Sequence, residues 1–121
     1  MTAKALGIQL LTSTNKVNMG LFKGNSHEVW MTLQNEIKSE LKDIEQFKDL
    51  DEVRNAFVNL SNSMIILANT FKPNETLFVL HCPMANNNKG ADWLSSSKEI
   101  RNPYYGAAML ACGEVKDTIK N

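Results

Sequence analysis

A regular apolar repeat between residues 53 and 71 constrains the fold of this chain most. Its apolar positions recur in steps of four, three, four, three and four residues, as they do along one face of an α-helix. These positions are Val53, Phe57, Leu60, Met64, Leu67 and Phe71. Asp49 followed by Glu52 is typical of a helix start, and Pro73 predicts the helix end. The repeat therefore predicts a long helix with one face toward a core.

A second apolar repeat predicts another amphipathic helix, which starts with Ser26 as its N-cap. Its apolar positions are Trp30, Leu33, Ile37, Leu41 and Ile44. Residues 3–21 show a weaker helical spacing, which Gly7 and a Ser/Thr/Asn-rich stretch interrupt. Two long helices joined by a short loop pack antiparallel, and the first segment supplies a third member. We therefore expect residues 1–72 to form a helical bundle.

The residue composition and the apolar pattern of the sequence change after residue 76. Residues 77–80 are a short apolar run with strand-like composition, and a loop rich in Asn and Ser follows. Residues 107–112 are expected to form a short helical turn. The expected fold is mainly α: an antiparallel bundle of three long helices plus a short strand-like segment, a motif loop and a short C-terminal helix. We expect one domain over residues 1–121, in which the segment 76–115 packs on the bundle.

Charge and composition exclude several functions. Thirteen Lys and Arg residues balance thirteen Asp and Glu residues, so we expect no non-specific electrostatic binding to nucleic acid. No apolar run is long enough for a membrane span. The N-terminus lacks the features of a signal peptide, so we expect either a cytoplasmic chain or one whose targeting segment has been removed. No phosphate loop, zinc-protease motif or CxxC motif is present, and we expect no enzymatic activity.

The side chains that could carry chemistry gather in the last third of the chain. His81, Cys82 and Met84 place an imidazole, a thiol and a thioether on one short loop. Met109 and Cys112 are three residues apart and would share one face of a helical turn. Soft metals prefer these ligands, Cu(I) above all, and Zn(II) prefers the Cys and His. The pattern predicts a metal site, with His27 as a further candidate imidazole.

Two structural interpretations compete with this prediction. Cysteine and methionine are common core residues, and a disulfide between Cys82 and Cys112 would equally bring the two segments together. A Zn(II) site formed by His81, Cys82 and Cys112 is the weaker metal alternative, because it leaves the thioethers unused. Adjacent residues on an extended chain point in opposite directions, so His81 and Cys82 are not expected to act as a base and a nucleophile.

The segment from His81 to Glu114 resembles a small domain of unknown function at the C-terminus of periplasmic adaptor proteins of copper and silver efflux pumps. The same domain also occurs alone in secreted bacterial proteins. The matching elements are His81 to Ala85, Gly90 to Leu94, Ile100 to Gly106, and Met109 with Cys112 to Glu114. The resemblance implies a helical bundle with an appended motif loop, a periplasmic or secreted location and an association with copper handling.

Other residues of this motif have structural explanations. We expect Trp93 and Tyr104 to anchor packing, Gly106 to form a turn, and Arg101 and Asn102 to tether the loop backbone. The leading hypothesis is a non-enzymatic Cu(I) or Ag(I) binding domain that sequesters or transfers the ion, with an efflux adaptor or a metallochaperone as partner. The alternative is a structural or interaction module with a disulfide and no metal.

Overall fold

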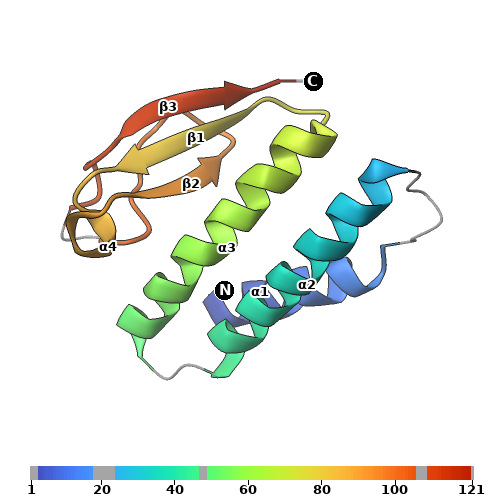
Figure 1. Cartoon of the computed structure of the whole chain (residues 1–121). Coiled ribbons are helices and arrows are strands. Elements are labelled where there is room, and N and C mark those ends of the chain that lie inside the picture. The colour runs from blue at the N-terminus through green and yellow to red at the C-terminus, as the bar shows by residue number, and fades with distance from the viewer. Residues whose placement is uncertain (1–2, 18–23, 47–48, 106–108, 121) are drawn as a thin grey trace. The chain divides into compact units, whose positions relative to one another are not determined.

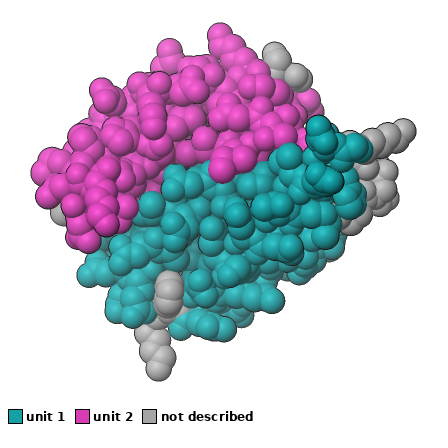
Figure 2. Space-filling model, in the orientation of Figure 1, with its two compact units in different colours: residues 1–63 teal, residues 64–121 magenta. Residues whose placement is uncertain are grey.

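A computed structural model describes residues 3–17, 24–46, 49–105 and 109–120 of the chain, and gives no side-chain surroundings for residues 3–8. The chain divides into two compact units, which Figure 2 shows in different colours. The first unit comprises residues 1–63 and is helical. The second comprises residues 64–121 and contains a β-sheet. The expected placement of the 76–115 segment on the helical bundle stays a prediction.

Three helices form before the sheet, and Figure 1 labels them α1 (Ala3–Asn15), α2 (Asn25–Gln46) and α3 (Leu50–Phe71). The helix α1 packs against α2. The buried face of α2 is the predicted one, and it consists of Trp30, Leu33, Ile37, Leu41 and Ile44. The apolar repeat of α2 therefore predicted its packing face correctly.

The buried face of α3 differs from the predicted one. Of the six positions in its apolar repeat, Leu60 alone is fully buried, and the others are half-buried. The remaining buried side chains of this helix are the small ones of Ala56, Ser61 and Ser63. The apolar repeat of α3 therefore did not predict which of its side chains are buried.

The ends of α3 form as the sequence predicts. The side chain of Asp49 accepts a hydrogen bond from the backbone N–H of Glu52 at 2.8 Å, which satisfies a free donor of the first turn. The helix ends at Phe71, two residues before Pro73. In contrast, α2 begins at Asn25, one residue before the expected cap Ser26. No helix in the described ranges is both long and apolar enough to cross a membrane.

The second unit contains a three-stranded antiparallel sheet, in which β1 (Leu77–Cys82) lies between β2 (Ala91–Ser95) and β3 (Glu114–Ile119) (Figure 1). Cys82 pairs with Ala91 on one side, and His81 pairs with Glu114 on the other. The pairing of β1 with β3 shifts register between Val79 and Leu80. Among the described residues of this unit, the buried apolar side chains are Val79, Leu80, Cys82, Ala85, Ala91, Trp93, Tyr104 and Ile119.

The expected mainly α fold is wrong, because the protein is a mixed α/β protein. The short strand-like segment is the centre of a sheet; β2 was expected to be part of a loop, and no element was predicted over β3. Part of the predicted helix over 107–112 lies outside the described residues, and the described part forms a turn that leads into β3. Backbone pairing with β1 makes β3 a strand, although Ile119 is its one buried residue.

Candidate functional site

The central strand β1 presents its last two residues to opposite sides of the sheet. Cys82 is completely buried, with an exposed fraction of 0%. The ring of His81 turns to its cross-strand neighbour Asp92, and its Nδ1 lies 2.6 Å from the carboxylate Oδ1. Successive side chains of a strand alternate between its two faces, so the imidazole and the thiol belong to different environments. His81 and Cys82 therefore do not form one ligand set.

A tight left-handed turn follows β1 and contains the short helical segment α4 (Ala85–Asn88). Its three asparagines have positive φ angles of 57°, 55° and 65°. Asparagine adopts this region more readily than most residues, because its short polar side chain bonds locally to the backbone. The backbone N–H of Gly90 donates to the carbonyl of Ala85 at 2.9 Å and closes the turn. The run of three asparagines thus returns the chain directly from β1 to β2.

Asn102 holds the segment that carries the second cysteine. Its side-chain amide donates to the carbonyl of Cys112 at 2.8 Å, and its backbone N–H donates to the carbonyl of Leu110 at 2.7 Å. Its Oδ1 accepts hydrogen bonds from the backbone N–H groups of Tyr104 and Tyr105 at 2.8 and 3.3 Å. Asn102 is only 1% exposed, and these bonds satisfy its amide in the core.

The two cysteine sulfurs meet in this setting, with Sγ of Cys82 and Sγ of Cys112 separated by 3.4 Å. Both are free thiols. Burial by itself raises the pKa of Cys82, but hydrogen bonds to its sulfur outweigh that effect and lower the pKa. The donors are the Cys112 thiol, the Met84 backbone, the Asn102 side chain and the Ala85 backbone. Cys82 is therefore the cysteine of the pair that ionises more readily.

The partner thiol has the opposite shift. The pKa of Cys112 is raised, first because its proton is held by the Cys82 sulfur and then because of burial and the charge of the Cys82 thiolate. One proton is thus shared between the two sulfurs, and removing it leaves two adjacent negative charges. A cation that binds both sulfurs would replace this proton and neutralise the second thiolate.

A separate polar cluster involves His81 and the edge strands. The Asp92 carboxylate contacts His81 through Oδ1, and its Oδ2 accepts a hydrogen bond from Lys116 Nζ at 3.0 Å. The Tyr104 hydroxyl donates to the backbone carbonyl of Asp92 at 2.6 Å. Lys116 was not among the predicted site residues, because no spacing in the sequence indicates that β3 pairs with β1.

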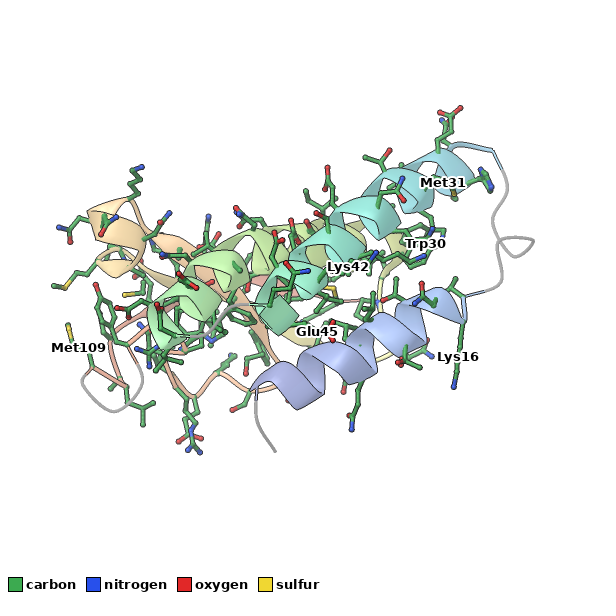
Figure 3. The ribbon with its side chains drawn as sticks, turned by 90° about the horizontal axis from the view of Figure 1, so that it is seen from below. Lys16, Trp30, Met31, Lys42, Glu45 and Met109 are labelled. Atoms are coloured by element: carbon green, nitrogen blue, oxygen red, sulfur yellow. The ribbon has the colours of Figure 1, made fainter. Side chains whose placement is uncertain are left out.

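The remaining candidate ligands are less closely associated with the thiols. Met84 follows Cys82 by two residues, and it is 45% exposed. Figure 3 shows the Met109 side chain at the edge of the loop that leads to Cys112, where it is half-buried. His27 is exposed in the first turn of α2, in the other unit. Within the described ranges, no three His, Cys, Asp or Glu side chains come together as a metal-binding group.

The motif residues with expected structural roles occupy several different environments. The rings of Trp93 and Tyr104 pack edge to face, with centroids 6.0 Å apart. Arg101 is exposed, and Gly106 lies outside the described residues. The hydroxyl of Tyr105 donates to the carbonyl of Met84, a contact that links the loop after β2 to the turn after β1.

These features define a small mixed α/β protein with a buried thiol paired to a second thiol. The model of the family described as "Protein of unknown function (DUF3347)" matches residues 1–76. This range is more than half of the chain, and the chain therefore belongs to that family. The matched range covers α1, α2 and α3 and ends just before β1, so both cysteines lie outside it. Searches of curated proteins and of solved structures found no match.

Proposed function

We propose that the protein is a non-enzymatic binder of Cu(I) or Ag(I) that sequesters or transfers the ion, with Cys82 and Cys112 as its principal ligands. The observation that carries the proposal is the 3.4 Å contact between the two sulfurs, one of which has a lowered pKa. Thiolate sulfur is the protein ligand that soft ions prefer, and the lowered pKa makes Cys82 easier to deprotonate than an ordinary cysteine.

The donor set suits a monovalent soft ion better than zinc. Metal–sulfur bonds are about 2.3 Å long, so sulfurs 3.4 Å apart can both reach one ion. Structural Zn(II) takes four Cys, His or carboxylate ligands, whereas the described residues provide no group of three. Low-coordinate Cu(I) needs two thiolates, and the thioethers of Met84 and Met109 are nearby in the sequence as additional ligands.

The resemblance of residues 81–114 to the domain of copper and silver efflux adaptors supports the same class of ion. We propose on this basis a periplasmic or secreted location, and an efflux adaptor or a metallochaperone as the partner. Such a partner would present its own soft ligands to the half-buried Cys112, because Cys82 is closed to solvent.

The test is a Cu(I) titration of the reduced protein, without oxygen, in competition with a chromogenic Cu(I) chelator. We expect one ion per chain, and an affinity about a hundredfold lower in Cys82→Ser and Cys112→Ser, because each variant removes a thiolate ligand. Met84→Ala should lower the affinity by about tenfold or less. The matched control is Met31→Ala, which removes an exposed methionine of the helical unit and should change nothing.

The outcome that contradicts the proposal is equal binding by the wild type and Cys82→Ser, or no binding by either. Metal analysis of protein purified without added metal tests the zinc alternative, since a resident zinc would be retained. Equal losses of affinity in Met31→Ala and Met84→Ala would show that the thioether effect is not local.

The same sulfur contact also favours a second function, a structural or interaction module in which Cys82 and Cys112 form a permanent disulfide. This bridge would fasten the loop before β3 to the central strand. A thiol count on denatured protein purified without reductant distinguishes the two functions. Two free thiols per chain support the ion site, and none, together with absent Cu(I) binding after reduction, supports the structural module.

A further inference from the structure

The cysteine pair is close enough for covalent chemistry as well as for ion binding. A disulfide requires sulfurs about 2.05 Å apart, and the present contact is 3.4 Å, so bond formation requires a local adjustment. Cys82 is held in the central strand of the sheet, whereas Cys112 lies in the turn between Met109 and β3. The remaining distance must therefore be closed mainly on the Cys112 side, where the backbone is held by Asn102 and not by strand pairing.

The two sulfurs differ in their access to solvent. Cys82 is completely buried, and Cys112 is half-buried. A dissolved disulfide of peptide size must approach a sulfur from outside, in line with the bond that breaks. Such a reagent can reach Cys112 and not Cys82. The asymmetry therefore gives the two cysteines different roles in any exchange reaction.

We propose that Cys112 is an exchange site for low-molecular-weight disulfides of the glutathione class, and that Cys82 resolves the adduct into an intramolecular disulfide. This inference rests on the proposed function in one respect, because the oxidised pair has no thiolate left for an ion. Oxidation would thereby release the bound ion or prevent its binding. The exchange reaction itself requires no metal.

The reaction proceeds in two balanced steps. The Cys112 thiol first passes its proton to the adjacent Cys82 sulfur and attacks one sulfur of the external disulfide, forming a mixed disulfide and expelling one thiolate, which takes up that proton and leaves Cys82 as the thiolate. The Cys82 thiolate then attacks Sγ of Cys112, forming the Cys82–Cys112 bond and expelling the second small thiolate, which is likewise protonated. The cysteine pair loses two electrons and two protons, and one external disulfide becomes two thiols.

The second step is expected to be fast compared with the first. The attacking sulfur is 3.4 Å from its target before the reaction begins, so the reaction is intramolecular and needs no second encounter. The mixed disulfide should therefore not accumulate in the wild-type protein. It should accumulate when Cys82 is absent.

The experiment treats reduced, metal-free protein with oxidised glutathione, quenches it with acid and measures the intact mass. The wild type should lose the mass of two hydrogen atoms and retain no glutathione. Cys82→Ser and Cys82→Ala should each carry one glutathione on Cys112, and the alanine variant provides the result if the buried serine impairs folding. Cys112→Ser should react at least about tenfold more slowly than Cys82→Ser, because its remaining sulfur is buried.

The control repeats the reaction in denaturing urea, where Cys82→Ser and Cys112→Ser should react at similar rates because burial is lost. Faster labelling of folded Cys112→Ser than of folded Cys82→Ser would overturn the proposal, as would a stable glutathione adduct on the wild type. If the glutathione exchange fails while the reduced protein still binds Cu(I), the exchange proposal alone is rejected. Successful exchange without Cu(I) binding rejects the ion site alone.

Discussion

Gly90 illustrates how a single backbone position shapes the end of the sheet. Its φ angle is +87°, and an added Cβ would lie 2.8 Å from Cε1 of the His81 ring. The absence of a side chain lets the imidazole lie against the turn while its Nδ1 contacts Asp92. Gly24 also has a positive φ, of +60°, but an added Cβ there would meet nothing within 4 Å. A comparison of alanine substitutions at the two positions therefore separates the cost of backbone strain from the cost of steric conflict.

We expect Gly90→Ala to lower the free energy of unfolding by about 2 to 4 kcal/mol, from left-handed strain together with the clash against His81. Gly24→Ala, the matched control, should cost about 1 to 2 kcal/mol from the strain alone. Urea unfolding of both variants measures the difference. Equal losses would mean that the His81 ring moves aside without cost.

The chemistry of individual residues was partly predictable from the sequence. The types and spacing of Cys82 and Cys112 indicated either a shared ion or a disulfide, and the structure places their sulfurs in contact. The alternation of side chains along a strand also predicted that His81 and Cys82 point apart. The interactions of Asn102 with both cysteine segments were not predictable in detail, because they depend on three loops meeting.

At the scale of elements, α2 and α3 are linked by a polar contact inside the helical unit. The hydroxyl of Ser63 lies 3.5 Å from Oε2 of Glu36 and 3.3 Å from Oε1 of Glu40. A hydroxyl has one proton, so it can donate to only one carboxylate at a time. The other oxygen of Glu40, Oε2, is buried and has no hydrogen-bond partner in the part of the chain described. The hydrogen-bonding capacity of the Glu40 carboxylate is therefore only partly satisfied.

The pKa of Glu40 is raised, mainly by burial and also by the charges of Glu36 and Asp43, while the Ser63 hydrogen bond opposes the shift. A carboxyl with a raised folded-state pKa binds its proton more tightly in the folded protein than in the unfolded one. Its contribution to stability is complete below its ordinary pKa and is lost as the pH rises through the raised value. The contribution of Glu40 to the stability of the folded protein should therefore decrease toward neutral pH.

We expect Glu40→Gln to be more stable than the wild type at neutral pH by about 0.5 kcal/mol, since it removes a like-charge pair one turn apart on α2. This advantage should shrink as the pH falls below the ordinary pKa of glutamate, where the wild type is protonated in both states. Urea unfolding over a pH series measures it. Glu45→Gln, at an exposed position of the same helix, is the control and should show no such pH dependence; identical curves for both variants would contradict the prediction.

Elements differed in how far their sequences predicted them. The apolar repeats identified α2 and α3 because their own side chains produce the helical period. β2 is only five residues long, and β3 has two apolar residues, Val115 and Ile119, of which it buries Ile119 alone. Hydrogen bonds to β1 decide that they are strands, and such pairing between distant segments leaves little trace in local composition. The mainly α prediction failed for this reason.

At the scale of the whole molecule, the chain contains a helical unit and a sheet unit, each with one buried tryptophan. Trp30 lies in the first unit and Trp93 in the second. A bond between Cys82 and Cys112 would close a loop within the second unit alone. The unfolding transition of the second unit, followed by Trp93 fluorescence, should therefore depend on the oxidation state of the cysteines.

We expect the disulfide to stabilise the sheet unit by about 3 to 4 kcal/mol in the chain-entropy model, because it closes a loop of 30 residues. The measurement is urea unfolding of Trp30→Phe, oxidised and reduced, with the fluorescence of Trp93 as the signal. The Cys112→Ser form of the same variant is the control: it cannot form the bridge, and its Trp93 transition should be the same before and after oxidation. An unchanged Trp93 transition after complete oxidation would show that the bridge does not constrain this unit.

The sequence alone determined the two long helices, the packing face of α2, the ends of α3 and the concentration of soft ligands after residue 80. Each of these depends on neighbouring residues, whose spacing is visible along the chain. Only the tertiary structure decided that β1 has a partner on each side, that the His81 ring contacts Asp92, and that Asn102 holds Cys112 beside Cys82. These features depend on contacts between segments 10 to 30 residues apart, and side-chain spacing does not encode them.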